Sequence, residues 1–292
     1  MKRRQVIGHL AAAPLLASLP VRAQSYPDKP IKIIVPLPPG SPPDVLARLV
    51  ADGVGRNWKQ PVVVENRPGG NGVLGLNVLA RSAPDGYTVG LVAITVAIAP
   101  HRGNPGFDTC KDFSPITNMM STTPVLVANK DTPFNTLGEL AAHARTRPGQ
   151  VAYGTPGVGT IPHLAVEQFQ HQAGVKLNHV PYKGATQQIQ DLIGGSTQVD
   201  SQSSLVVALP QIKADRIKPL AVLSESRSPL LPQVPTAKES GYPGMVTAPW
   251  FGIGAPAGVP AEVVQKVHAV LVKGLNTKEM QDKFAATGMT VH

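Results

Sequence analysis

The chain has 292 residues, of which 42% are apolar and 15% charged, and it is rich in proline (30) and glycine (28). This composition indicates a globular protein whose length permits one large domain or two of medium size. A chain of this length buries roughly 75% of its unfolded surface and needs neither disulfides nor metal to fold. Cys110 is its single cysteine, which excludes a disulfide framework within the chain. We interpret this thiol as a packing or idle group rather than a nucleophile.

The formal net charge is +9, but four of the basic residues and no acidic residue lie within the first 23 residues. The remaining 269 residues carry +5, with no run of Lys or Arg and few aromatic side chains to stack on bases. We therefore expect no binding to nucleic acid. A mildly positive field instead favours small anionic ligands.

The first 23 residues have the pattern of a signal peptide. A basic start (Lys2, Arg3 and Arg4) precedes a short apolar stretch, Val6–Leu19, and Ala23 is the small residue that a signal peptidase prefers. The apolar stretch is too short to span a membrane comfortably. We expect a periplasmic protein that is exported by either the Sec or the twin-arginine route, with its signal peptide cleaved after Ala23.

The first predicted strand, Ile33–Val35, leads into a proline-rich turn that ends at Gly40 and precedes an amphipathic helix. Asp44 stands where we expect the N-cap of this helix. The prolines stiffen the turn, and Gly40 lets the backbone approach a guest closely. Because a helix start presents unpaired N–H groups and the positive end of the helix dipole, this turn is suited to an anion.

Strand-like and helix-like segments then alternate along the chain, which predicts a parallel α/β architecture. We expect the later strands at 62–65, 87–94, 125–128, 151–154, 179–182, 198–200, 218–223 and 250–255. We expect the later helices at 73–81, 137–145, 163–173, 186–193, 205–214 (interrupted by Pro210), 261–275 and 277–286. A short strand is expected to end the chain.

The region 224–244 is rich in Ser, Pro and Gly and is predicted to be an irregular connection. We therefore expect two α/β lobes: lobe 1 from residues 24–123 and 225–292, and lobe 2 from residues 124–224. The chain would cross between the lobes twice. Two crossings make a hinge with a cleft between the lobes, which is a usual place for a small ligand.

Two glycine-rich segments follow predicted strands. Gly70–Gly75 matches G-x-G-x-x-G, but four loop residues separate it from its strand, and the next strand ends in Thr95 rather than in an acidic residue. We interpret it as a glycine-rich helix start that faces a cleft, not as a nucleotide site. Gly154–Thr160 supplies N–H groups and two hydroxyls at a helix N-terminus. Together with the turn at Gly40, it could clamp one carboxylate from both sides.

Patterns typical of catalysis are sparse. The chain has no G-x-S-x-G, no H-E-x-x-H and no paired Cys/His spacing. A capping or cleft-lining role is favoured for His163 over proton transfer. Asp200 could be a general base, although an Asp at a strand end more often orients loop N–H groups. The sequence therefore favours binding without chemistry, with no cofactor and no metal.

Six short motifs occur in a characteristic order along almost the whole chain after residue 25. They are Tyr26–Pro30, Val35–Gly40, Val64–Gly69, Ala83–Thr88, His179–Gly184 and Pro249–Gly252. In this order they resemble the Bug family, the extracytoplasmic substrate receptors of tripartite tricarboxylate transporters. The resemblance implies a two-lobed α/β type II periplasmic-binding-protein fold with a hinge and an interlobe cleft. It also implies that a small organic carboxylate is bound and delivered to an integral-membrane permease, and we expect a monomer.

The resemblance further implies which residues hold the carboxylate, through backbone N–H groups, hydroxyls and bridging waters. The expected contacts are Gly40, Ser41, Thr95, Thr155, Gly159, Thr160, Asp200 and Ser203. The far end of the ligand would select among dicarboxylates, amino acids and aromatic acids, and the sequence does not name the ligand.

Three features depart from the family's pattern. Ser41-Pro42-Pro43 stands where a second glycine and a small residue are common, and because proline has no N–H, the Ser41 hydroxyl is expected to replace lost anion contacts. Ser201–Ser204 stands where apolar strand residues are usual, which alters the contacts in that loop. The chain ends at His292 where one more long helix usually packs on lobe 1, so we expect an exposed apolar patch there.

Two alternatives to a receptor stay open from the sequence. One is an enzyme on the same scaffold that acts on a small organic acid, with Asp200 or His163 as acid or base. The other is a truncated, non-functional family remnant.

Overall fold

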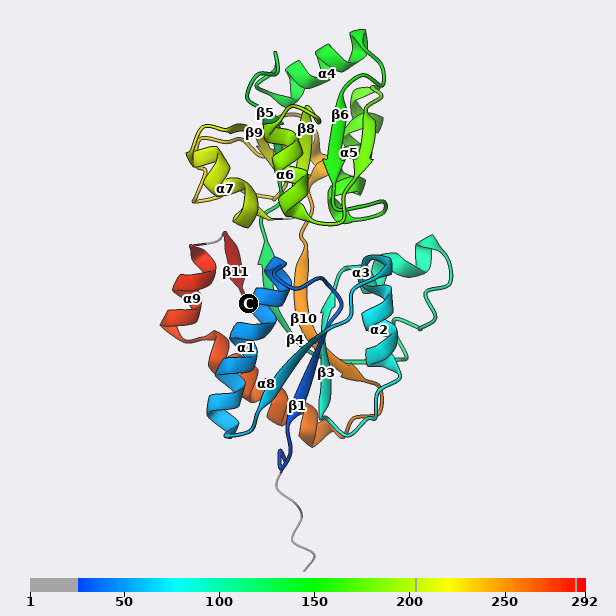
Figure 1. Ribbon diagram of the computed structural model, residues 1–292, viewed down its shortest axis with the longest axis vertical. Coiled ribbons are helices and arrows are strands. Elements are labelled where there is room, and N and C mark those ends of the chain that lie inside the picture. Colours follow the sequence, from blue (N-terminus) through cyan, green and yellow to red (C-terminus); the bar gives the residue numbers. More distant parts are fainter. Residues whose placement is uncertain (1–25, 203, 287) are drawn as a thin grey trace, which may run out of the picture.

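The computed structural model describes residues 26–202, 204–286 and 288–292, so the predicted signal peptide and Ser203 lie outside the described residues. The chain forms two α/β lobes, each built around its own sheet and arranged along the longest axis of the molecule (Figure 1). Within the described ranges, none of the helices combines the length and the apolar character that a membrane span requires.

Lobe 1 contains a six-stranded sheet with the order β11-β4-β10-β3-β1-β2. Its strands are β1 (Ile31–Val35), β2 (Val62–Asn66), β3 (Thr88–Ala93), β4 (Phe113–Thr122), β10 (Trp250–Pro256) and β11 (Met289–Val291). Its helices are α1 (Pro42–Trp58), α2 (Val73–Ala80), α3 (Thr95–Ile98), α8 (Ala261–Leu275) and α9 (Lys278–Ala285), with the 3-10 turns η1 (Gly70–Gly72) and η2 (Ala99–Arg102). Strand β1 is parallel to both β2 and β3, whereas β10 is antiparallel to β3 and β4.

Lobe 2 contains a five-stranded sheet with the order β7-β6-β8-β5-β9. Its strands are β5 (Val125–Asn129), β6 (Ala152–Thr155), β7 (Asn178–Pro181), β8 (Val199–Gln202) and β9 (Ile217–Val222). Its helices are α4 (Leu137–Thr146), α5 (Ile161–Ala173), α6 (Ala185–Ile193) and α7 (Leu205–Lys213), with the 3-10 turn η3 (Pro243–Met245). Strand β6 is parallel to β7 and β8, and β5 is antiparallel to β8 and β9.

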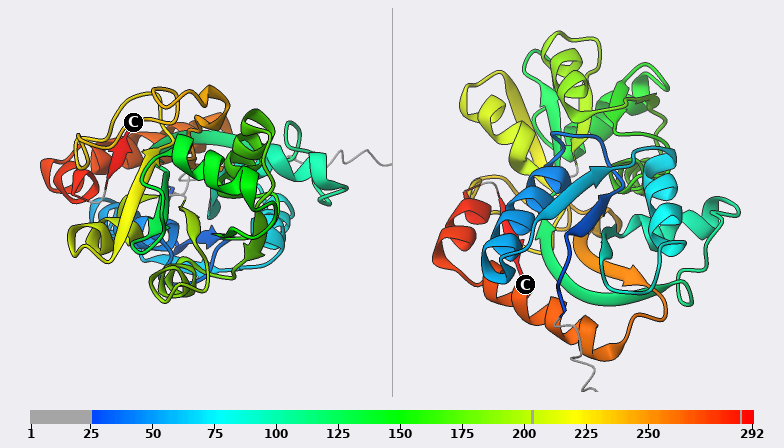
Figure 2. Two further views of the ribbon diagram at one scale, coloured as in Figure 1. Left: turned by 90° about the horizontal axis from the view of Figure 1, so that it is seen from above. Right: turned by 60° about the horizontal axis from the view of Figure 1, so that its bottom comes forward.

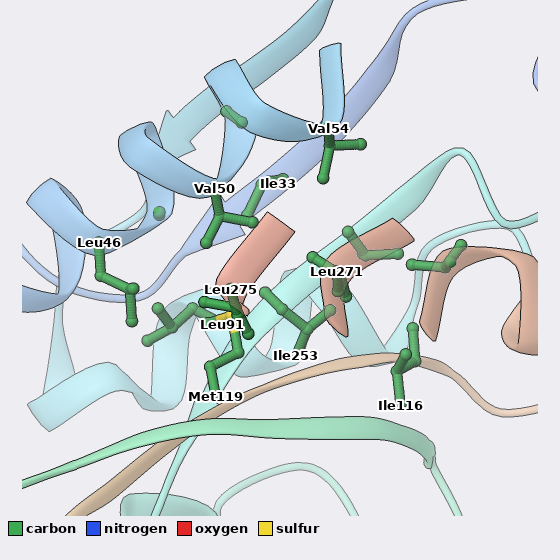
Figure 3. Close-up of a cluster of buried hydrophobic side chains, with 14 of the residues drawn as sticks. Ile33, Leu46, Val50, Val54, Leu91, Ile116, Met119, Ile253, Leu271 and Leu275 are labelled. Atoms are coloured by element: carbon green, nitrogen blue, oxygen red, sulfur yellow. The ribbon is translucent and has the colours of Figure 1, made fainter. Parts of the chain in front are cut away.

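The core of lobe 1 fixes the strand ends that face lobe 2. Helix α1 places Leu46, Val50 and Val54 four residues apart on one face, where they pack with Ile33 of β1 and Leu271 of α8 (Figure 3). Helix α2 lies on the other face of the sheet (Figure 2, right). Because burying each such side chain contributes about 1.5–3 kcal/mol, this packing holds the sheet rigidly behind the turns at its edge.

Most predicted strands and helices are present with ends shifted by one or two residues, and the helix at 261–275 has the predicted bounds. The predicted parallel pairing is present at β1, β2 and β3 and at β6, β7 and β8, and each sheet also contains antiparallel strands beside the connections between the lobes. Helix α7 is not interrupted at Pro210: the N–H of Ala214 donates to the Pro210 carbonyl (3.1 Å), and Ala208 and Leu209 are buried.

Strand β4 was not predicted from the sequence, although it has ten residues. Its buried and exposed positions do not alternate regularly, and its pairing with β10 shifts register twice. An alternating pattern is the main signal of a half-buried strand, so a strand that bends between two lobes gives little of it.

The two connections between the lobes lie side by side. The N–H of Thr122 donates to the Pro249 carbonyl (3.0 Å), and the N–H of Thr247 donates to the Leu223 carbonyl (2.7 Å). The region between β9 and the second connection packs on lobe 2, since Met245 and Ala237 are part of its core. We therefore propose that lobe 2 extends to about residue 246, with the second crossing at 247–249 rather than near 224.

Candidate functional site

Most of the residues expected to contact a ligand lie at the carboxyl ends of β1, β3 and β6, whereas Asp200 lies within β8. Strands β1 and β3 are parallel neighbours in lobe 1, and β6 and β8 are parallel neighbours in lobe 2. Gly40 and Ser41 follow β1, Thr95 begins α3 after β3, and Thr155 ends β6. Carboxyl ends of neighbouring parallel strands are the usual ligand position in open α/β sheets. The fold therefore gathers the expected residues at one edge of each sheet.

The turn after β1 starts its helix earlier than predicted. Ser41, not Asp44, is the N-cap residue, and Asp44 is the third residue of α1. The reason is that prolines at the first two helical positions need no N–H partner there, so the helix starts at Pro42. The Asp44 carboxylate reaches back and accepts a hydrogen bond from the N–H of Gly40 (2.8 Å), as the acidic residue of a capping box does.

The buried carboxylate of Asp44 is the centre of a polar network that includes the exposed Arg48 and the half-buried Asn66. Its two oxygens accept bonds from Nε and Nη2 of Arg48 (3.1 Å each) and from Nδ2 of Asn66 (2.7 Å). Burial opposes ionisation, but the hydrogen bonds from Arg48, Asn66 and Gly40 hold the pKa of Asp44 below its usual range. The N-terminus of α1 thus already holds a carboxylate that belongs to the chain.

This network changes what the turn can offer a ligand. The N–H of Gly40 is engaged by Asp44, and the Ser41 hydroxyl donates to the Pro38 carbonyl (2.7 Å). Gly40 has φ +77° and no atom within 4 Å of the position that a Cβ would take. At this turn a ligand can therefore approach the backbone of Gly40 closely, but it does not find a free N–H group there.

The turn after β6 is stabilised by hydroxyls and an imidazole. The N–H of Gly157 donates to Oγ1 of Thr155 (3.2 Å), and the Thr160 hydroxyl donates to the Gly157 carbonyl (2.7 Å). The N–H of Gly159 donates to Nδ1 of His163 in the first turn of α5 (3.3 Å). The structure thus brings Thr155, Gly159 and Thr160 together in one turn, and His163 has the capping role that the sequence favoured.

A ring cluster behind this turn was not predicted. The rings of Tyr153 and His179 stack at 4.9 Å, and those of His163 and His179 lie 4.3 Å apart. Nε2 of His179 lies 2.6 Å from the Thr155 hydroxyl. Burial lowers the pKa of both histidines, and the neighbouring His163 lowers that of His179 further. The turn is therefore backed by neutral imidazoles at pH 7, and the dispersed histidines of the sequence gave no sign of this contact.

Asp200 is entirely buried in β8. The side-chain amides of Gln188 and Gln202 donate to its two oxygens, the latter at 2.9 Å. Burial raises the pKa of Asp200 to about 7, although both amides act in the opposite direction. The carboxylate itself therefore faces the interior, and only the backbone of β8 continues toward the edge of the sheet.

Two segments of lobe 1 contact the turn after β6. Nδ2 of Asn71 in η1 donates to the Val158 carbonyl (2.8 Å). The side chain of Arg102 in η2 lies against Gly159, where a methyl group would be 2.7 Å from its Nε atom. The G-x-G-x-x-G segment is thus a helix start that reaches lobe 2. Its last glycine, Gly75, is required because a Cβ there would lie 2.7 Å from Cα of Pro36.

No group of three His, Cys, Asp or Glu side chains is placed to hold a metal ion in the part of the chain that the structure describes. The site consists of backbone turns, hydroxyls, neutral imidazoles and one arginine at the contact between the lobes. Such a set can bind and orient a small polar molecule, whereas proton transfer would need an exposed acid or base at the reacting atom.

Comparison with known proteins agrees with this architecture. Residues 46–292 match the family described as tripartite tricarboxylate transporter family receptor. BugT of Bordetella pertussis is 36% identical over 98% of this chain and 88% of its own length.

Among solved structures, an R. palustris protein with adipate has a TM-score of 0.84 and 31% identity, covering 91% of this chain and 89% of its own. MatC from Rhodopseudomonas palustris with bound malate has a TM-score of 0.82 and 26% identity, covering 91% of each chain. The predicted two-lobed fold and the resemblance to Bug proteins are thereby confirmed. The chain belongs to the tripartite tricarboxylate transporter receptor family, of which the Bug proteins are members.

Proposed function

We propose that the chain is an exported periplasmic receptor that binds a small organic carboxylate between its lobes and delivers it to the permease of a tripartite transporter. It acts as a monomer, after cleavage behind Ala23. The observation that carries this proposal is the arrangement of the strand ends. A turn suited to a small polar guest follows a parallel strand in each lobe, and the turn of lobe 2 already contacts lobe 1. Two similar proteins hold adipate and malate, both of which are small carboxylates.

We propose that the turn after β6 faces the carboxylate through Gly159 and Thr160, whereas Thr155, which is wholly buried, holds this turn from the interior. Gly40, Ser41 and Thr95 line the opposite side from lobe 1. Ser203, which follows β8 of lobe 2 in the sequence and lies outside the described residues, is proposed as a further contact. Asp200 acts from behind, because its oxygens are held by Gln188 and Gln202 and none of its surface is exposed.

An enzyme that uses Asp200 or His163 as acid or base is not favoured. A general base must come within hydrogen-bond reach of the proton that it removes. Asp200 is wholly buried between two amides, and Nδ1 of His163 is occupied by the N–H of Gly159. The family is one of receptors, which agrees with binding without turnover.

The test is a thermal-shift screen of small carboxylates, including malate and adipate, on the wild-type chain and on Gly159→Val. A ligand present at a hundred times its dissociation constant stabilises the wild type by about 2.7 kcal/mol. We expect Gly159→Val to fold but to lose this shift, since a Cβ there collides with Arg102.

The matched control is Gly149→Val. Gly149 also has φ +73°, but it has no atom within 4 Å of a Cβ position, so the substitution strains the backbone without touching lobe 1. This control should retain the ligand shift. Undiminished carboxylate binding by Gly159→Val would sink the assignment of the turn, and no carboxylate bound by the wild type would sink the proposed function.

A further inference from the structure

Arg102 lies at the contact between the lobes, on the loop that follows Thr95. It ends η2, directly after α3, and its side chain crosses to lobe 2 and rests on Gly159. Its side chain is exposed, so a guest at the edge of the contact can reach the guanidinium. Arg102 thus touches the turn that is proposed to bind the carboxylate, but from the opposite lobe.

The guanidinium of Arg102 has no acidic partner within residues 26–202, 204–286 and 288–292. The acidic residue of the neighbouring cluster, Glu167, has other partners: the Tyr153 hydroxyl (2.6 Å) and the Gln170 amide (2.7 Å) donate to it, and Nε2 of His163 lies 3.7 Å from its Oε1. A guanidinium carries five N–H donors in a planar fork that matches a carboxylate. A cation without a carboxylate therefore stands at the edge of a site proposed to receive one.

The backbone N–H groups of both turns are largely engaged within the protein. The N–H of Gly40 donates to Asp44, that of Gly157 to Thr155, and that of Gly159 to His163. The two imidazoles behind the lobe 2 turn are neutral at pH 7, because burial lowers their pKa. Few backbone N–H groups at these turns are therefore free to stabilise the negative charge of a ligand. The guanidinium of Arg102 at the same place can stabilise that charge instead.

We propose that Arg102 binds a carboxylate of the ligand where the two lobes meet and so determines the preference of this receptor for anions. This inference rests on the proposed carboxylate-receptor function. The guanidinium forms a charge-assisted, forked pair with the ligand as lobe 1 closes on the turn after β6. Gly159 leaves the space that this pair needs.

The experiment is calorimetric titration of Arg102→Gln and Arg102→Lys against a panel of small mono- and dicarboxylates that includes malate and adipate. For the ligand that the wild type binds most tightly, we expect Arg102→Gln to lose about tenfold in affinity. Arg102→Lys should lose less, because it keeps the charge but not the fork. Arg81→Gln, an exposed arginine at the end of α2 in the same lobe, is the matched control and should stay within about twofold of the wild type.

The dependence of affinity on salt separates charge recognition from simple closure of the lobes. Asn71→Ala removes the neutral interlobe bond to Val158 and should weaken binding without changing its dependence on NaCl. Arg102→Gln should reduce both the affinity and its salt dependence. Unchanged affinity, or lost affinity with unchanged salt dependence, in Arg102→Gln overturns this inference alone. No carboxylate bound by the wild type overturns the proposed function, and this inference with it.

Discussion

The turn after β1 and the turn after β6 occupy equivalent places in their lobes, but they are stabilised by opposite electrostatic means. In lobe 1 the helix start is filled by the buried carboxylate of Asp44, which is paired with Arg48. In lobe 2 the turn is held by Thr155 and neutral His163, and the buried carboxylate beside it, Asp200, has only amides as partners.

This difference indicates how the two lobes divide the work of binding. A second anion beside Asp44 would meet a like charge, whereas the lobe 2 turn is bordered by the imidazole of His163, whose Nε2 lies 3.7 Å from Oε1 of Glu167. We infer that lobe 1 contributes space at Gly40 and the cation Arg102, and that lobe 2 contributes the turn at Gly159 and Thr160. The difference between the two turns predicts three changes in stability, which decrease in size from Asp200 to Asp44 to His163.

The largest change in the free energy of unfolding is expected from a substitution of Asp200. Its pKa is raised to about 7 in the folded chain from an ordinary value of 3.8, so the folded state binds more protons than the unfolded state between these values. Stability should therefore fall as pH rises through this window, by about 1.4 kcal/mol per unit of raised pKa. Asp200→Asn should remove this pH-dependent contribution, since an amide does not ionise.

Urea unfolding of the wild type and Asp200→Asn at pH 5, 6, 7 and 8 measures this effect as a difference between the two chains. The variant should gain stability relative to the wild type as pH rises. A constant difference across the range would show that Asp200 ionises normally.

The second-largest change in the free energy of unfolding is expected from a substitution of Asp44. Asp44→Ala leaves Arg48, Asn66 and the N–H of Gly40 without their shared acceptor, which should lower the free energy of unfolding by about 3 kcal/mol. Because the folded pKa of Asp44 is lowered, its contribution is present above pH 4 and is lost as pH falls through the folded pKa. Equilibrium unfolding at pH 7 measures it.

The matched control for Asp44 is Glu139, an acidic residue in the first turn of α4. It also reaches back to a backbone N–H, that of Asn135 (2.6 Å), but it is exposed and has no arginine partner. Glu139→Ala should cost about 1 kcal/mol or less. An equal loss in the two variants would contradict the special role of the buried carboxylate in lobe 1.

The smallest change in the free energy of unfolding is expected from a substitution of His163. Burial lowers its pKa in the folded state, so the unfolded state takes up the proton first as pH falls below 6.5. Stability should then decrease with acidity, and His163→Gln should reduce this decrease between pH 7 and pH 5. Thermal unfolding at both values measures it.

The sequence predicted much of the local structure, because it depends on neighbouring residues. The apolar positions of 261–275 recur at helical spacing, and α8 has these bounds. The order of six motifs indicated the fold and the family, which the comparisons confirm. The same reasoning failed at β4, whose bend between the lobes removes the alternating pattern.

What the sequence by itself determined is therefore the order of strands, turns and helices, and the places where a ligand was to be expected. Tertiary structure alone decided the chemistry of those places. Asp44 of α1 gains its partner Asn66 from β2. The ring of His163 in α5 lies 4.3 Å from that of His179 in β7, and Arg102 reaches Gly159 across the two lobes. The physical reason is that burial and the electrostatic environment of a group depend on atoms that are near in space but far along the chain, and no local pattern encodes them.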